Sequence, residues 1–212
     1  MDFIIDPSLV IYLPLYESDG ASFISKDTYG HLCTATGAFW KPDGRFLDGE
    51  DDVIYVPDHP ALRPTEAISI ELFMKPLTIN VTGEGVISKS PLGAALGDWE
   101  IWLDTTACKF SVDKAVTLVV TSTPLIVDYW VHLMFTYDRN KLRVYRDGVP
   151  DAEIDSTAAI PTSIDPIRIG VWYQDVAIRH LNFQLGILRI YNRALSSLEV
   201  NRNYLVTKWR HQ

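Results

Sequence analysis

Residues 130–148 read WVHLMFTYDRNKLRVYRDG, and this stretch decides the fold. Apolar side chains alternate through its first eight residues, at Val131, Leu133, Phe135 and Tyr137. Successive side chains on a strand point to opposite faces of a sheet, so this alternation predicts a strand. The turn DRNK at 138–141 then reverses the chain, KLRVYR returns, and Asp147-Gly148 supplies another tight turn. The stretch therefore predicts an antiparallel β-hairpin.

The same period of two recurs on both sides of this hairpin. It is found in ISIELFMK at 68–75, in DWEIWLD at 98–104 and in IRIGV at 167–171. Turn clusters such as KPDG, DGEDD and an Asp-Pro pair separate these stretches. Many short, half-buried strands with closely spaced turns are typical of a sandwich or a barrel and not of βαβ units.

One helix is predicted, near the C-terminus. Ser196 and Glu199 have the spacing of a capping box, in which each side chain bonds the backbone N–H of the other residue. Leu195 and Val200 are placed for a hydrophobic staple, and we expect the helix to run to about Val206. Because no internal repeat, low-complexity tract or linker interrupts the chain, we expect one domain over residues 1–212.

Composition and charge exclude several functions. The chain has 212 residues, of which 47% are hydrophobic and 22% charged, so wholesale disorder is excluded. Its 19 Lys and Arg against 27 Asp and Glu give a net charge of −8. Nucleic-acid binding and docking on anionic lipid both need a basic surface, so neither is expected. Neutral glycans, calcium and protein partners stay open.

The two cysteines and the N-terminus carry further expectations. Cys33 and Cys108 are too few for a disulfide scaffold and match no zinc motif, so two buried free thiols are favoured over one bridge. The N-terminal stretch MDFIIDPSLV has acidic residues in place of a basic region, and Pro7 interrupts it, so we predict no signal peptide. The longest charge-free apolar stretch, 115–127, is too short to span a membrane. A role outside the cell would therefore need a signal-independent route.

Four segments, in order, resemble the laminin-G-like group of the concanavalin A-like lectin/glucanase superfamily. The first is FLDGEDDVIYVPDHPAL at 46–62, followed by AISIELFMKP at 67–76. The second is GVISK at 85–89, followed by DWEIWLD, and the third is the hairpin at 130–148. The fourth is LGILRIYNRALSSLEV at 185–200. Each segment alone is weak, but together they are specific for a fold.

The resemblance implies an all-β fold: an antiparallel jelly-roll β-sandwich of two curved sheets with one short C-terminal helix. It also implies that the first and last strands pair, which agrees with the apolar runs Leu9–Leu15 and Leu188–Tyr191. It says less about function, because such sandwiches include lectins, adhesion modules, polysaccharide hydrolases and virion proteins.

The strand DWEIWLD at 98–104 carries the candidate catalytic carboxylates. Glucanases of the superfamily carry Glu-x-Asp-x-(x)-Glu on one strand, whose alternate carboxylates face a cleft. Asp98, Glu100 and Asp104 do alternate on one face here, but Trp102 occupies the place of the helper Asp. The spacings also differ. We therefore predict a solvated strand face and no catalytic residue.

Calcium is the second kind of site that the resemblance implies. SKDTYGHLCTATGAFW at 25–40 is similar to a family loop in which an Asp side chain and loop carbonyls hold a structural calcium. The matching ligands are Asp27 and the carbonyl of Gly30. Related sequences often add an acid where Gly186 stands, so one anionic ligand is missing, and an ordinary polar turn is the alternative. The acidic run 48–52 is interpreted as a solvated hairpin loop.

Aromatic residues supply the candidates for glycan binding. Sugar sites combine flat aromatic faces with a few placed polar groups. Four aromatic residues away from the predicted core positions form the expected binding face: Trp102, Tyr129, Trp172 and Tyr173. Three others, Trp40, Trp99 and Trp130, stand at positions of the family motif that predict core packing.

The function expected from these residues is that of a non-catalytic, lectin-like recognition or adhesion module. Its partners would be glycans or proteins, and we expect a homo-oligomer or docking on a larger assembly. One alternative is a structural protein of a phage or viral particle, such as a capsid decoration, a head fibre or a tail adhesin. The other is a polysaccharide hydrolase or lyase.

Overall fold

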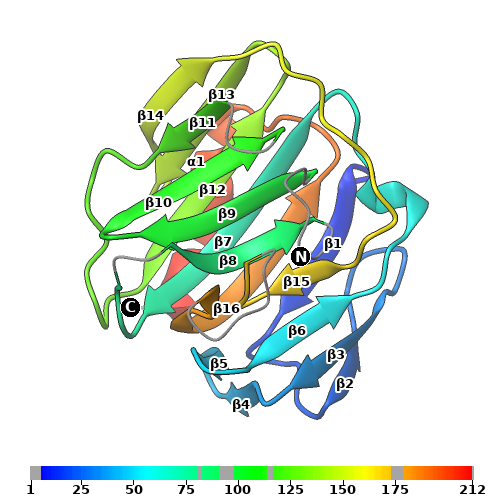
Figure 1. Cartoon of the computed structure of the whole chain (residues 1–212), viewed down its shortest axis with the longest axis vertical. Helices are drawn as coiled ribbons and strands as arrows, with labels where there is room; N and C mark the ends of the chain where they lie inside the picture. Colours follow the sequence, from blue (N-terminus) through cyan, green and yellow to red (C-terminus); the bar gives the residue numbers. More distant parts are fainter. Residues whose placement is uncertain (1–5, 81–82, 91–97, 114–116, 173–178, 212) are drawn as a thin grey trace.

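Two antiparallel β-sheets lie face to face in the computed structural model (Figure 1), which describes residues 6–80, 83–90, 98–113, 117–172 and 179–211. The first sheet has the strand order β14 (Val149–Asp155), β13 (Lys141–Arg146), β12 (Val131–Tyr137), β7 (Ile68–Pro76), β16 (Asn182–Tyr191), β5 (Gly44–Asp48) and β4 (Phe39–Lys41), with β1 (Leu9–Pro14) also paired to β16. The second sheet has the order β11 (Thr117–Val120), β10 (Ala107–Val112), β9 (Trp99–Asp104), β8 (Glu84–Lys89), β15 (Ile167–Ile169), β6 (Val53–Val56), β3 (Leu32–Thr36) and β2 (Ser22–Ile24). The predicted all-β sandwich is therefore confirmed.

Three short helical segments have both of their ends among the described residues. These are η1 (Pro60–Leu62), α1 (Ser197–Thr207) and η3 (Lys208–Arg210). The predicted capping box is present, with Ser196 Oγ accepting from the N–H of Glu199 and the Glu199 carboxylate accepting from the N–H of Ser196. No described helix combines the length and the apolar character that crossing a membrane would need.

The predicted hairpin is present as β12 and β13, and the terminal strands pair as the resemblance implied. Leu13 of β1 lies opposite Leu188 of β16, and both side chains are buried. One cluster of buried apolar residues fills the space between the sheets and takes side chains from strands of both. The alternating residues of β7 and β12 point into this cluster, as the period of two predicted.

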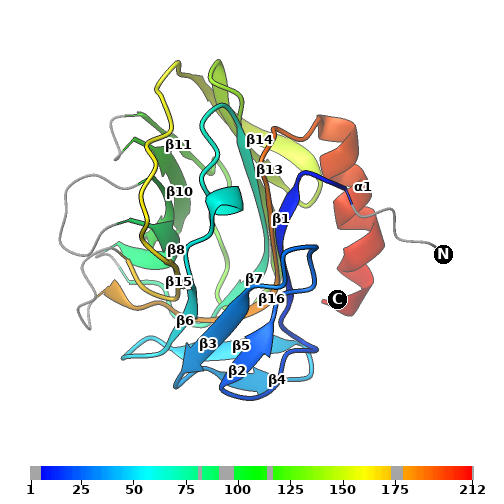
Figure 2. The same cartoon turned by 90° about the vertical axis from the view of Figure 1, so that its right-hand side faces the viewer.

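The outer face of the first sheet is covered at β7 and β12, so the expectation of half-buried strands is wrong for these two strands. Figure 2 shows α1 outside the layer that holds β7, β16 and β1. Beneath it, Glu71 Oε1 accepts from Arg189 Nη1 at 2.9 Å and bonds His132 Nε2 at 3.1 Å. Glu71 Oε2 accepts from Nδ2 of Asn203 on α1 at 2.9 Å. This buried charge group fixes the helix on the sheet and lets a polar strand face lie away from water.

The two cysteines are buried and free, as expected. Cys33 lies on β3 and Cys108 on β10, with β9, β8, β15 and β6 between these strands in the second sheet. Five inter-strand steps of about 4.8 Å put the two strands about 24 Å apart, whereas a disulfide needs Cα atoms within about 7 Å. A bridge between them is therefore excluded.

Candidate functional site

Two of the predicted binding residues lie together on the outer face of the second sheet. The indole rings of Trp102 on β9 and Trp172, just after β15, stack with centroids 5.3 Å apart and planes 14° apart. The Arg179 guanidinium lies 4.8 Å from the Trp172 ring centre. Gly83 leaves room for this group, since a Cβ there would lie 3.2 Å from both Trp172 and Arg179.

Glu100 completes this group and fixes the orientation of its outer ring. Trp172 Nε1 donates to Glu100 Oε2 at 2.7 Å. Trp102 is buried at 5% exposure, whereas Trp172 is half-buried and offers part of its indole to a ligand. We call Glu100, Trp102, Trp172 and Arg179 the paired-indole site.

The other two predicted binding residues do not join this group. Tyr129 precedes β12 of the first sheet and is 67% exposed, and it has no ring contact among the described residues. It stands in an exposed apolar turn with Ile126 and Val127. Tyr173 lies outside the described residues.

The three carboxylates weighed for catalysis have separate partners. Asp98 lies before β9, accepts from Ser163 at 2.9 Å and lies 3.6 Å from the buried Lys89 ammonium. Glu100 holds the indole of Trp172, and Asp104 accepts from Lys109 at 2.6 Å. Burial raises the pKa of Asp98, and the contacts of Ser163 and Lys89 oppose this rise. The predicted solvated strand face is wrong for Asp98 and Glu100, which are both buried.

The predicted calcium ligand Asp27 accepts backbone hydrogen bonds. Its Oδ2 accepts from the N–H of Tyr12 at 3.0 Å, and its Oδ1 accepts from Tyr29 and Gly30 at 2.9 and 3.2 Å. Gly30 adopts φ +64°, a conformation that favours glycine, where the chain turns beside this carboxylate. The three bonds define a tight polar turn joined to β1, while calcium at Asp27 stays a prediction.

Gly186 is glycine because a ring passes against it. A Cβ at this position would lie 2.2 Å from Cε1 of His211 and 3.0 Å from the carbonyl oxygen of Asp43. An acidic side chain at this position would displace the His211 ring. The His211 ring therefore occupies the space that a second acidic calcium ligand would need at position 186.

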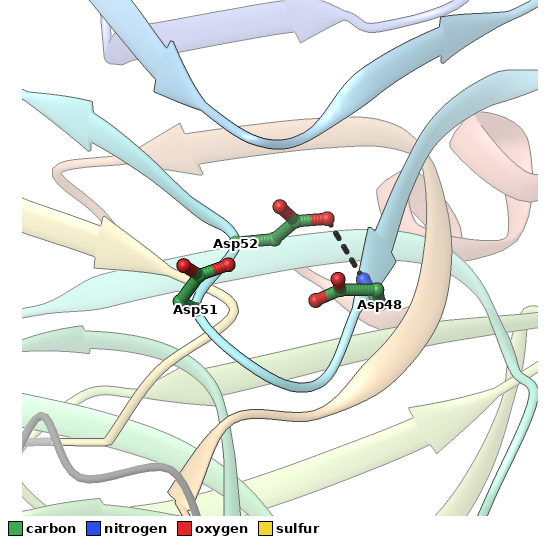
Figure 3. A group of neighbouring side chains, drawn as sticks. All are labelled: Asp48, Asp51 and Asp52. Atoms are coloured by element: carbon green, nitrogen blue, oxygen red, sulfur yellow. Dashed lines mark hydrogen bonds between the residues drawn. The ribbon is translucent and has the colours of Figure 1, made fainter.

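An acidic group of three residues closes the turn between β5 and β6 (Figure 3). The carboxylates of Asp48, Asp51 and Asp52 place one oxygen each within 4.8 Å of the others. Asp52 is buried, its Oδ2 accepts from the N–H of Asp48 at 2.9 Å, and burial together with the neighbouring acids raises its pKa. Asp52 thus stabilises the predicted hairpin loop. The loop is solvated at Glu50 and Asp51, as predicted, but Asp52 itself is buried.

Trp40 departs from its predicted place in the core. Trp99 is buried at 1% exposure as expected, but Trp40 is 37% exposed, because the three-residue strand β4 lies at the edge of the first sheet. Trp40 lines a cavity of about 260 Å³ together with Asp19, Gly20, Gly37 and Arg45. The lack of alternation in Phe39-Trp40-Lys41 was the available signal that this tryptophan is not a core residue.

Comparison with known sequences gives one family match. The model described as the concanavalin A-like lectin/glucanases superfamily matches residues 48–201, which include the paired-indole site. No curated protein sequence matches the chain.

Similar solved structures are recognition domains and an enzyme. The binding domain of Paraclostridial Mosquitocidal Protein 1 has a TM-score of 0.74 and 15% identity over 93% of this chain and 52% of its own. The botulinum neurotoxin serotype D ligand binding domain, in complex with N-acetylneuraminic acid, has a TM-score of 0.76 and 13% identity over 94% and 51%. Trypanosoma rangeli sialidase has a TM-score of 0.74 and 16% identity over 98% and 34%. The chain thus spans about half of each toxin domain and a third of the sialidase, and at these identities the likeness is one of fold.

Proposed function

Because the chain belongs to the concanavalin A-like lectin/glucanase superfamily, we propose that it is a non-catalytic, lectin-like module that binds glycans. The observation that carries the proposal is the paired-indole site. A sugar ring packs its C–H face on an aromatic surface, while its hydroxyl groups bond polar groups at the rim. Trp172, together with the Arg179 guanidinium that lies over its ring, supplies the aromatic and polar groups, and Trp102 and Glu100 hold the indole in one orientation before a ligand arrives.

Two further observations support recognition over catalysis. Among the described residues, the acids on and beside β9 contact Lys89, Ser163, Trp172 and Lys109, which favours a structural role for these carboxylates over a catalytic one. In addition, two of the similar structures are binding domains of toxins, and one of them holds N-acetylneuraminic acid. Oligomerisation and a role on a virion stay predictions.

A glycan array with the purified chain tests the proposal. We expect binding to a defined set of glycans, and we expect Trp172→Ala to weaken it at least tenfold, because the exposed ring of the site is lost. Trp209→Ala is the matched control, since Trp209 is 63% exposed on η3, and it should leave binding unchanged. Failure of the unmodified protein to bind any glycan at high concentration would contradict the proposal.

A further inference from the structure

A cavity of about 260 Å³ opens beside Trp40 and is lined by residues of β3, β4, β5 and the segment before β2. We propose that this cavity is a second ligand site, separate from the paired-indole site, and that it binds one neutral sugar ring. The choice of ligand rests on the proposed glycan-binding function.

Trp40 forms a fixed aromatic wall of the cavity. Its Nε1 donates to the carbonyl oxygen of Tyr16 at 2.8 Å, which holds the indole in place while 37% of the residue stays exposed. Trp40 pairs with Arg45 across β4 and β5. Directly opposed residues of an antiparallel pair project from the same face, so the indole and the guanidinium flank one space.

Arg45 organises the loops around the cavity. It is 2% exposed and donates from Nε to Ser18 O at 2.9 Å and from Nη1 to Ala38 O at 2.8 Å. Its Nη2 donates to Ser18 O and Gly20 O. These four bonds join the segment before β2 to the turn before β4, so the cavity is shaped in advance. A guanidinium has five N–H donors, and the fifth, on Nη1, has no acceptor among the described residues.

Charge favours a neutral, hydroxyl-rich ligand. Asp19 lines the same cavity and is exposed, and its Oδ1 accepts only from the adjacent N–H of Gly20 at 2.6 Å. Asp19 and Arg45 both line the cavity and the Asp19 carboxylate acts electrostatically on the guanidinium, so the lining holds one negative and one positive charge that balance. Sugar hydroxyls can donate to the carboxylate and accept from the guanidinium at once, whereas a charged ligand meets one like charge.

The size of the cavity limits the ligand to one ring. Sites for drug-sized ligands usually enclose about 300–1,000 Å³, and this cavity is slightly smaller. Its lining includes Gly20, Ala21, Ala35, Gly37 and Ala38, none of which carries a side chain larger than a methyl group. A single sugar at the end of a longer glycan therefore fits the arrangement better than an internal stretch of chain.

An NMR titration of the full chain tests the site. The probes are the methyl glycosides of glucose, galactose, mannose and N-acetylglucosamine, with N-acetylneuraminic acid as the charged comparison. We expect at least one neutral glycoside to shift the amide signals of Gly20 and Gly37 and the indole signal of Trp40 with millimolar affinity. Trp40→Ala should weaken binding at least tenfold, Asp19→Asn at least threefold, and the control Trp209→Ala should change nothing.

Ala21→Trp keeps the test decisive if Trp40→Ala does not fold, because Ala21 is exposed and a large ring there fills the cavity mouth. Neutral glycosides that leave these signals unmoved would overturn the site, as would tighter binding of N-acetylneuraminic acid. Array binding that depends on Trp172 and is unchanged by Trp40→Ala and Ala21→Trp would overturn this site and leave the proposed function standing. The absence of any glycan binding in both assays would overturn both.

Discussion

His211 is held as a neutral ring near the end of the described chain. Its ring centre lies 4.4 Å from those of both Phe73 and Trp130, and it is 5% exposed. Within the described part of the chain neither ring nitrogen has a hydrogen-bond partner. Burial lowers the pKa of His211 from 6.5 to about 4, because a charged imidazole cannot be solvated there.

This pKa predicts a loss of stability in mild acid. Between about pH 6.5 and pH 4 the unfolded chain binds a proton at His211 that the folded chain does not. Protonation therefore costs the fold no stability above pH 6.5, and the free energy of unfolding falls as the pH falls from 6.5 to 4. A shift of this size corresponds to at most about 3 kcal/mol. Urea unfolding at pH 7 and pH 4.5 should show a smaller pH dependence in His211→Phe than in the unmodified protein. Identical pH dependences would contradict the prediction.

Asp27 has a structural role that can be separated from metal binding. Because its carboxylate accepts three backbone N–H bonds, we expect Asp27→Ala to lower the free energy of unfolding by about 1–3 kcal/mol. Melting curves with and without a chelator then test calcium. If calcium is bound, chelator should lower the melting temperature of the unmodified protein and leave that of Asp27→Ala unchanged. If Asp27 acts only through its hydrogen bonds, chelator should leave the melting temperature of both proteins unchanged.

The helix α1 depends on a charge buried beneath it. Burial alone would raise the pKa of Glu71, but the Arg189 guanidinium and His132 hold it at about 2. The carboxylate therefore stays ionised and keeps Asn203 of α1 bonded to the sheet over the ordinary pH range.

Glu71→Gln is predicted to destabilise the fold strongly. It removes the charge that compensates the buried Arg189, and breaking such a buried pair costs roughly 3–5 kcal/mol. Glu66→Gln is the matched control, because the Glu66 side chain is 76% exposed in its ion pair with Arg139, and it should cost less than about 1 kcal/mol. Urea unfolding measures both. Equal effects of the two substitutions would show that Glu71 does not anchor the helix.

Local sequence patterns predicted which segments form strands and which forms the helix, but they did not predict which strand faces are buried. The alternation in WVHLMFTY and the turn after it predicted β12 and β13, and the Ser196–Glu199 spacing predicted the start of α1. The same alternation predicted polar faces open to water. That was wrong for β7 and β12, because no local pattern shows that a helix much later in the chain covers Glu71 and His132.

The candidate site depends on the topology of the whole molecule. Trp102 and Trp172 were both named from the sequence, yet their contact follows from the order β9, β8, β15 in the second sheet, which neither segment encodes alone. Trp40 was assigned to the core because its motif position suggested packing. Its exposure follows from β4 being an edge strand, a property of the assembled sheet.

The molecule as a whole is predicted to bind polysaccharides without cleaving them. Asp98, Glu100 and Asp104 are each engaged by other groups, so we expect no new reducing ends after prolonged incubation with a broad polysaccharide panel. Release of products by the unmodified protein, and its loss in Glu100→Gln, would contradict the non-catalytic assignment. Retained release in that variant would point to a contaminating enzyme.

The burial of Cys33 and Cys108 has a practical consequence for handling the protein. Both thiols lie in the core, and burial raises the pKa of Cys33 to about 12 and that of Cys108 well above its usual range. Alkylating reagents attack thiolates, so the native chain should stay unlabelled while any molecule that opens is trapped. The rate at which the two thiols are alkylated therefore reports how often the folded chain opens. Because both native thiols are buried, one cysteine introduced on the surface can be labelled with a dye or attached to a support without reaction of the native thiols.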